Sequence, residues 1–288
     1  MTFCTRFAPS PTGPLHLGHA YSALVAHGMA RAINGRFLLR IEDIDQTRSR
    51  PAWEQKIYDD LNWLGITWDA PPMRQSDRTP VYRSALDALW ARGLLYPCTC
   101  TRRDIAEAAS APQEGAEPVF GPDGLIYPGT CRDKPIPKGT ELPDNVALRM
   151  NMNRALASLP ASTAFEFEET GVEPGPIRFS AHDLVSTVGD IVLSRKDFPG
   201  SYHLSVVLDD DDQGITHVIR GRDLFEATKI HVVLQLLLGL ETPVYHHHRL
   251  IRDEAGKRLA KRDDARAIAT YRAEGMRPED IRKMVGLI

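Results

Sequence analysis

The sequence predicts an α/β protein in which crossover helices connect the strands of a parallel sheet. Apolar runs typical of strands alternate with runs at helical spacing over the first 96 residues. The alternation runs strand, helix, strand, helix, which is the order that parallel strands joined by helices require.

The elements follow in order along this first part of the chain. Residues 2–8 (TFCTRFA) form the first expected strand, and a helix over 19–35 ends at Asn-Gly, a common helix stop. Residues 36–45 (RFLLRIEDID) form the second strand, apolar and then acidic. Amphipathic helices are expected over 51–66 and 80–96.

The amino-acid composition of the sequence then changes. Residues 98–176 are rich in proline, glycine and short polar runs, which predicts a loop-rich inserted module. Strand-like runs return over 190–224, and 226–240 predicts a helix with one buried face. A short strand, a charged loop and two short helices complete the chain.

Composition excludes several classes of protein. The chain has 288 residues, 42% of them hydrophobic, and a net charge of −3, so a nucleic-acid partner would have to meet a local basic patch. No apolar run is long enough to span a membrane, and the N-terminal residues lack the apolar core of a signal peptide. We therefore expect a cytoplasmic protein without membrane contact.

One motif near the N-terminus is chemically specific. RFAPSPTGPLHLGHAYSAL, residues 6–24, places His16 and His19 behind a constrained loop at the start of a helix. Pro9, Pro11 and Pro14 restrict the backbone of this loop, and Gly13 and Gly18 let a ligand approach it closely. Unpaired N–H groups at a helix start attract phosphate, to which histidines can donate hydrogen bonds. Taken alone, two such histidines would be interpreted as a helix cap in a proline-rich turn.

The length of the match decides between these readings. PSPTGPLHLGHA resembles the HIGH signature of class I aminoacyl-tRNA synthetases in its glutamate-specific form, and RIEDID (40–45) is similar to the same branch. The resemblance covers most of the chain. It implies a Rossmann-type catalytic domain with a zinc-containing insertion, a short helical C-terminal extension and no anticodon-binding domain. The expected divisions are 1–97 and 177–245 for the catalytic domain, 98–176 for the insertion, and 246–288 for the KMSKS-like loop and helical tail.

The second signature of this family is expected late in the chain. RLAKR (258–262) resembles the KMSKS loop, with Lys261 at the second lysine position. Arg258 replaces the first lysine and keeps its charge, whereas Ala260 replaces a serine and loses a hydroxyl. A lysine in this loop can neutralise the phosphates of ATP.

The family resemblance also implies roles for individual residues. Arg6 carries a planar guanidinium suited to a carboxylate, and Glu42 could bind an ammonium group. The arginine that takes the substrate's side-chain carboxylate stays open. The catalytic candidates are His16, His19 and Lys261. ATP, with Mg²⁺, is expected at Pro9, Gly18, His19, Arg258 and Lys261. Glutamate is expected at Arg6, Phe7, Ala8, Pro9, Ser10, Glu42, Tyr202 and Arg220.

The cysteines predict a metal site. In a reducing compartment, spaced cysteines indicate metal more often than a disulfide, and three thiolates can hold one structural zinc ion. Cys98 and Cys100 precede YPGTC, which ends at Cys131, whereas Cys4 belongs to another strand. The family pattern Cys-x-Cys, Tyr-x-x-x-Cys implies Tyr127 as fourth ligand, while water or a histidine is the alternative.

Two polar runs receive structural interpretations. Consecutive strand residues alternate faces, so His246–His248 cannot converge on one ion and are expected on a strand surface. LDDDDQG (208–214) is expected to be a turn, with Asp209 and Asp210 bordering the active site.

The end of the sequence suggests the acceptor. Only 26 residues follow Arg262, too few for a separate anticodon-reading domain. The chain resembles a truncated branch of the family that activates glutamate with ATP without needing tRNA. That branch esterifies glutamate onto the queuosine base in the anticodon of tRNA(Asp). We therefore expect ATP, L-glutamate and queuosine-bearing tRNA(Asp) as partners of a monomer.

Residues 249–288 contain 11 Lys and Arg against 7 Asp and Glu, a basic surplus of 4. This surplus fits contact with a polyanion, or merely a solvated helical surface. Two alternatives for function remain open. One is ordinary charging of the 3′ end of tRNA(Glu), and the other is a non-catalytic RNA-binding protein derived from a synthetase.

Overall fold

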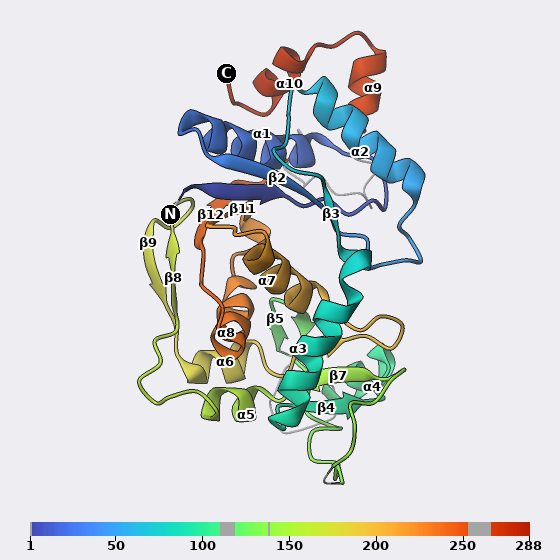
Figure 1. The fold of residues 1–288 in the computed structure, drawn as a ribbon, viewed down its shortest axis with the longest axis vertical. Helices are drawn as coiled ribbons and strands as arrows, with labels where there is room; N and C mark the ends of the chain where they lie inside the picture. Colours follow the sequence, from blue (N-terminus) through green and yellow to red (C-terminus); the bar gives the residue numbers. More distant parts are fainter. Residues whose placement is uncertain (1, 110–118, 138, 253–265) are drawn as a thin grey trace.

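The computed structural model describes residues 2–109, 119–137, 139–252 and 266–288 (Figure 1). The strands are β1 (Cys4–Phe7), β2 (Arg36–Ile41), β3 (Met73–Arg74), β4 (Leu95–Cys98), β5 (Phe120–Gly121), β6 (Gly124–Leu125), β7 (Ala147–Met150), β8 (Glu166–Glu169), β9 (Gly175–Arg178), β10 (Val192–Ser194), β11 (His217–Gly221) and β12 (Val244–His248). The helices are α1 (Leu17–Ala32), α2 (Pro51–Trp63), α3 (Thr79–Ala91), α4 (Arg102–Ala109), α5 (Met152–Ala157), α6 (Ala181–Thr187), α7 (Tyr202–Asp212), α8 (Thr228–Leu238), α9 (Ile268–Ala273) and α10 (Pro278–Met284). Two short 3₁₀ turns, η1 (Gln75–Arg78) and η2 (Arg222–Leu224), complete the set.

Parallel strands form the centre of the molecule, as the sequence predicts. β1 pairs with β2 and β2 with β3, all in parallel. β11 pairs in parallel with β12, and β12 with β8, which carries β9 as an antiparallel edge. The N–H of Thr216 donates to the carbonyl of Cys4 over 3.0 Å, which places β11 beside β1. The chain therefore crosses from one half of the sheet to the other between β1 and β11.

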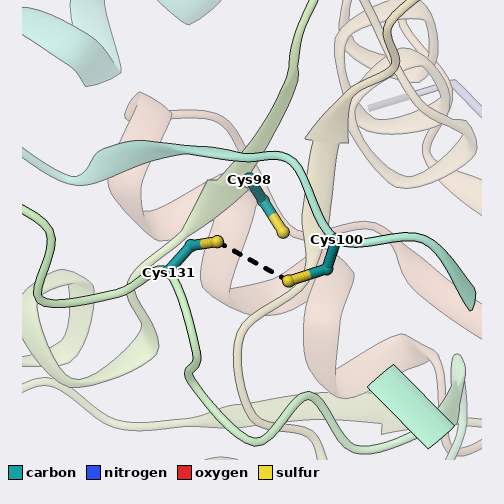
Figure 2. Close-up of side chains that lie close together, drawn as sticks. All are labelled: Cys98, Cys100 and Cys131. Atoms are coloured by element: carbon teal, nitrogen blue, oxygen red, sulfur yellow. Dashed lines mark hydrogen bonds between the residues drawn. The ribbon is translucent and has the colours of Figure 1, made fainter. Parts of the chain in front are cut away.

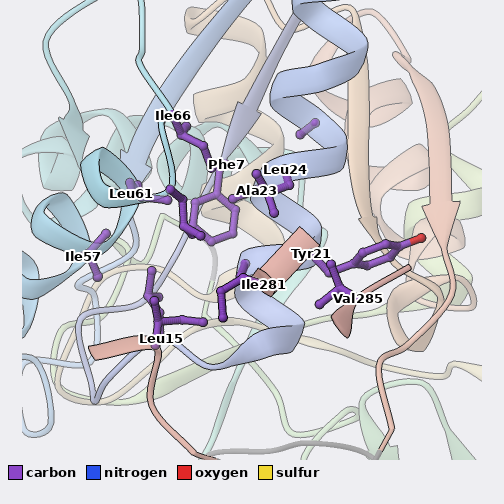
Figure 3. Packing of buried hydrophobic residues seen from close by; sticks show 14 of the residues in the cluster. Phe7, Leu15, Tyr21, Ala23, Leu24, Ile57, Leu61, Ile66, Ile281 and Val285 are labelled. Atoms are coloured by element: carbon purple, nitrogen blue, oxygen red, sulfur yellow. The ribbon is translucent and has the colours of Figure 1, made fainter. Parts of the chain in front are cut away.

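Helices cover both faces of these strands. In Figure 1, α1, α2 and α10 lie on one side of β1 and β2, and α7 and α8 lie on the other. On the first side, Phe7, Leu24 and Ile281 belong to one buried cluster, in which residues far apart in the sequence meet (Figure 3). Burying these side chains fixes α1 against β1 and so fixes the loop between them.

A second core lies below the parallel strands in Figure 1. There β4, β7 and β10 form an antiparallel sheet in the order β10-β7-β4. Its buried side chains include Tyr82, Met150 and Leu204, which join α3 and α7 to this sheet. The assignment of 98–176 to a separate insertion stays a prediction.

The structure corrects the strand-like reading of 190–224. Residues 202–212 form α7 between the short strand β10 and β11, and the expected turn LDDDDQG is largely the last turn of this helix. Ser201 caps α7 by accepting the Leu204 N–H over 3.4 Å. Because α7 is buried on several sides and its buried residues include polar ones such as Ser205 and Asp209, its sequence does not show the period of an amphipathic helix.

The helices expected at 19–35, 51–66 and 226–240 are present within a few residues, and two short helices close the chain. The helix expected at 80–96 is correct only to Ala91, because Leu95 and Tyr96 belong to the strand β4. The short helices α4, α5 and α6 are not among the elements expected from the sequence. Within the described ranges, no helix is both long and apolar enough to cross a membrane.

Candidate active site and cysteine cluster

A cavity of about 570 Å³ opens at the carboxyl ends of β1, β2, β11 and β12. In an open α/β sheet, ligands bind at this edge, where the chain switches from one half of the sheet to the other. The cavity brings together predicted residues from four separate segments: Arg6, Phe7, Ala8, Pro9, Ser10, His16, Gly18, His19, Glu42, Tyr202 and Arg220.

The two motif histidines cap α1 and line the cavity at once. Nδ1 of His16 accepts the Gly18 N–H over 3.1 Å, and Nδ1 of His19 accepts the His16 N–H over 3.2 Å. Their rings lie 3.8 Å apart. A ring nitrogen that accepts a hydrogen bond carries no proton, so both imidazoles hold their proton on Nε2. The cap therefore fixes the tautomer that can donate to a phosphate oxygen.

Gly18 is required by this arrangement. A Cβ at this position would lie 2.9 Å from Cε1 and 3.1 Å from Nδ1 of His16. Any larger residue at 18 would push the His16 ring away from the position in which it caps the helix.

One carboxylate joins two arginines beside the cavity. Asp210 accepts from Nε of Arg6 over 2.7 Å and from Nη1 of Arg40 over 2.7 Å. Arg40 also reaches Glu42, at 3.5 Å. Arg6, Arg40 and Asp210 are all buried. Asp210 thereby neutralises much of the charge on Arg6, the arginine that the sequence offers for a carboxylate.

Burial and these arginines move two pKa values in opposite directions. Burial alone raises the pKa of Asp210, but Arg6 and Arg40 outweigh it and the pKa falls below the ordinary value. For Glu42, burial prevails over the same arginines and raises its pKa.

Arg220 has a different environment from Arg6. Its guanidinium donates to Nε2 of His247 at 3.1 Å and Nδ1 of His231 at 3.0 Å. It also donates to the Thr228 hydroxyl at 2.8 Å and the Leu224 carbonyl at 3.2 Å. All four acceptors are uncharged. Arg220 therefore presents an arginine charge to the cavity without a carboxylate partner among the described residues.

The expectation that His246–His248 form a strand surface is wrong for two of the three. They do lie in β12, but His247 is fully buried and His248 is 7% exposed. These two side chains point to opposite faces of β12, and both faces are covered at this end of the strand, which a run of histidines does not reveal. His247 donates from Nδ1 to the buried carboxylate of Glu169 over 2.5 Å.

Tyr202 begins α7 and lines the cavity, and burial raises the pKa of its hydroxyl. Arg258 and Lys261 lie outside the described residues. On either side of their segment, Ile251 lines the cavity, and the Ile268 N–H donates to the Leu15 carbonyl over 2.8 Å.

Figure 2 shows the cysteine cluster, in which Cys98, Cys100 and Cys131 point toward one another. Their sulfur atoms all lie within 4.8 Å of one another, and those of Cys100 and Cys131 are 3.6 Å apart. The Tyr127 hydroxyl lies 3.4 Å from the sulfurs of both Cys98 and Cys100. Cys4 is buried in β1, as expected, and is not part of this group.

These distances fit a metal ion held by four ligands in tetrahedral coordination. With Zn–S bonds of about 2.3 Å and Zn–O bonds of about 2.0 Å, a tetrahedron places sulfurs about 3.8 Å apart and sulfur about 3.5 Å from oxygen. Hydrogen bonds from Tyr127 and the Thr99 backbone outweigh burial and lower the pKa of Cys131 to about 6. Three cysteines and one phenol therefore have the chemistry and spacing of a metal site.

Sequence reasoning missed the residues that hold the cavity residues in place. They are Arg40, Asp210, His231, Glu169 and His247. The sequence indicates only that Asp210 borders the site, because its partner Arg6 lies 204 positions away. A charged residue inside an apolar strand, as Arg40 is in RFLLRI, was the one available signal.

Comparison with known proteins agrees with this geometry. The family model described as tRNA synthetases class I (E and Q), catalytic domain, matches residues 2–288. A glutamyl-Q tRNA(Asp) synthetase of Rhodobacter capsulatus is 63% identical over 98% of this chain and 99% of its own length. The same-named protein of Geobacter sulfurreducens is 42% identical over 93% and 78%.

Among solved structures, a glutamate tRNA ligase from Elizabethkingia meningosepticum, crystallised with its amino acid, superposes with a TM-score of 0.74 at 27% identity. The alignment covers 99% of this chain and 60% of that protein, so the chain spans well under two thirds of the longer ligase. With the family model matching nearly every residue, the chain belongs to the class I tRNA synthetases (E and Q), and the part described here is their α/β catalytic domain.

Proposed function

We propose that this chain activates L-glutamate with ATP, without tRNA, and transfers the glutamyl group to the queuosine base of tRNA(Asp). The observation that carries the amino-acid half is the charge pattern of the cavity. Three arginines (Arg6, Arg220 and Arg249) and two carboxylates (Glu42 and Asp223) line it. The buried pair of Arg40 and Asp210 lies behind Arg6. Together these charged groups have one net positive charge. Glutamate, with two carboxylates and one ammonium, has one net negative charge and is its complement.

The pattern also suggests an orientation for the substrate. Glu42 offers a carboxylate to the ammonium group, at the edge where β2 ends. Arg220 is held by neutral acceptors and offers its charge to the side-chain carboxylate. Tyr202 lines the same cavity and provides a hydroxyl for the amino acid.

Adenylate formation is assigned to the motif histidines that line the same cavity. An oxygen of the glutamate α-carboxylate attacks the α-phosphorus of ATP, the bond to the β-phosphate oxygen breaks, and pyrophosphate leaves. The Nε2–H groups of His16 and His19 are proposed to donate to phosphate oxygens as negative charge grows. Pro9 and Gly18 border the nucleotide, and Mg²⁺ is expected to enter with ATP. Arg258 and Lys261 are included as pyrophosphate ligands on the sequence motif alone.

In the second step a queuosine hydroxyl attacks the acyl carbon, its proton is lost, and AMP leaves. The acceptor is proposed from the 63% identical relative, which is named for this tRNA. The cysteine cluster with Tyr127 is proposed to hold one structural zinc ion outside the reacting centre.

The test supplies purified protein with radiolabelled glutamate, ATP and tRNA(Asp), either containing or lacking queuosine. We expect labelling only of the queuosine-containing tRNA, and glutamate-dependent ATP–pyrophosphate exchange without any tRNA. A parallel arm with tRNA(Glu) checks for charging of the 3′ end. Equal labelling of both tRNA(Asp) samples, or label on tRNA(Glu) alone, would overturn the proposal.

A further inference from the structure

We propose that His231 and His247 are positioning residues that keep Arg220 an uncompensated cation and thereby make the site prefer glutamate to glutamine. The inference deepens the proposed function and rests on it. Neither histidine lines the cavity, and both are almost completely buried.

The hydrogen bonds fix where each proton sits. His247 accepts from Nε of Arg220 at its Nε2, so its single proton is on Nδ1, which faces Glu169 at 2.5 Å. The Glu169 carboxylate is held in turn by the N–H groups of His247 and Gly171, at 2.9 and 2.6 Å. Glu169 thus determines the tautomer of His247 without touching Arg220.

His231 is oriented in the same sense. Its Nδ1 accepts from Nη1 of Arg220 over 3.0 Å, so its Nε2 carries the proton and donates to Nδ1 of His203 over 3.1 Å. Nε2 of His203 lies 3.4 Å from a carboxylate oxygen of Asp123. Both imidazoles therefore present a lone pair to Arg220 and direct their protons away from it.

The consequence is electrostatic. Arg6 is paired directly with Asp210, at 2.7 Å, whereas among the described residues no carboxylate lies within ion-pair distance of Arg220. Two carboxylates are linked to Arg220 only through imidazoles. Glu169 is separated from it by His247, and Asp123 by His203 and His231. The two imidazoles fix the orientation of the Arg220 guanidinium but do not neutralise its charge.

Fixing an arginine with neutral acceptors favours an anionic ligand. A substrate carboxylate supplies the missing countercharge, whereas the amide of glutamine does not and leaves a buried cation unpaired. If the support were itself a carboxylate, Arg220 would already be satisfied and the difference between the two amino acids would shrink.

One matched pair of variants isolates this charge. The side-chain oxygen of Asn or Asp lies close to where His carries Nδ1, so H231N and H231D keep an acceptor for Arg220 and differ in charge. The readout is ATP–pyrophosphate exchange with L-glutamate and with L-glutamine, giving kcat and KM for each. We expect H231N to keep the wild-type ratio of kcat/KM values within about tenfold, and H231D to lower it by about 10- to 100-fold, mainly by raising KM for glutamate.

A second pair of variants tests the inference independently, in case H231D does not fold. H247Q keeps an acceptor near the Nε2 position, and H247L removes it, so H247Q is expected to keep glutamate preference and H247L to lose it. Thermal unfolding establishes which variants fold. If wild-type protein shows no glutamate-dependent exchange, the proposed function fails and this inference with it. If wild-type protein is active but H231N matches H231D and H247Q matches H247L in preference, only the inference is overturned.

Discussion

The backbone N–H of His16 donates to Nδ1 of His19 over 3.2 Å, so the second motif histidine holds the helix terminus on which the first one sits. His16 repeats the arrangement with Gly18. From the sequence, a helix cap and a pair of phosphate donors are competing interpretations. In the structure they are the same two side chains, because capping uses Nδ1 and leaves the proton on Nε2.

Replacing His19 by Asn separates the two roles. The Asn side-chain oxygen lies close to where His19 carries Nδ1 and keeps the bond from His16, but no donor replaces Nε2–H. We expect a free energy of unfolding within about 0.5 kcal/mol of wild type and a kcat for ATP–pyrophosphate exchange lower by about 100- to 1,000-fold. His19→Ala should lose the same activity and in addition about 1 kcal/mol of stability. An Asn variant with wild-type kcat would remove His19 from the chemistry.

Gly18→Ala tests whether His16 must occupy its capping position. The new Cβ would meet Cε1 of His16 at 2.9 Å, so the ring has to move. We expect kcat for exchange to fall by about tenfold or more, with the glutamate KM little changed. Gly28→Ala in the same helix is the control, because a Cβ there meets nothing within 4 Å. It should keep full activity and gain roughly 0.5–1 kcal/mol of stability.

Asp210→Asn addresses the buried charge network. The change leaves Arg6 and Arg40 without their shared carboxylate, in a region where all three side chains are buried. Urea unfolding should show a loss of about 3–5 kcal/mol. Asp212→Asn is the control in the same helix, since this half-exposed carboxylate pairs with Arg78 and should contribute less than about 1 kcal/mol. Equal losses for the two variants would contradict a buried network.

The cysteine cluster predicts one bound metal ion per chain. Metal content measured by plasma emission should be about one zinc for wild-type protein and for Cys4→Ser, and none for Cys131→Ser. Tyr127→Phe should keep the three thiolates but bind the ion more weakly, with an altered Co²⁺ absorption spectrum. A Tyr127→Phe spectrum identical to wild type would show that the phenol packs beside the ion without ligating it.

The sequence predicts local features of this protein well and distant partners poorly. The HIGH-like loop, the α1 helix and the grouping of three cysteines depend on residues close in the chain or on a spacing shared by a family. The ion pair of Arg6 with Asp210 depends instead on packing between segments 204 positions apart. Nothing local distinguishes such a carboxylate from a solvated one.

The histidines of β12 show a second limit. A polar run in a strand is expected to face water, but β12 lies inside the sheet between β11 and β8. His247 and His248, which point to opposite faces of the strand, are both buried, whereas His246 is half-buried. His247 is accommodated because Glu169 accepts the hydrogen bond from its Nδ1–H and Arg220 donates to the lone pair on its Nε2. The sequence contains each of these residues but not the pairing that makes their burial tolerable.

This buried pair also predicts a pH dependence of stability. Burial and Arg220 lower the pKa of His247 from 6.5 to about 4, and Glu169 only partly opposes them. Well above pH 6.5 the ring is neutral in folded and unfolded chains alike, so it adds no pH dependence. Between pH 6.5 and 4 the unfolded chain binds a proton that the folded chain does not. Stability is therefore lost as the pH is lowered through this window, by up to about 1.4 kcal/mol per pH unit.

The variant H247Q lacks this group while keeping an acceptor for Arg220, so the difference between the two proteins isolates it. Other buried imidazoles, such as His231 and His248, are common to both proteins. Urea unfolding at pH 7.5 and 5 should show wild-type protein losing about 2 kcal/mol more than the variant. Above pH 5 the Glu169 carboxylate, whose pKa lies below its ordinary value because the bonds from His247 outweigh burial, stays ionised in the wild-type protein. Parallel pH curves for the two proteins would contradict a lowered pKa for His247, which its full burial against Glu169 and Arg220 leads us to expect.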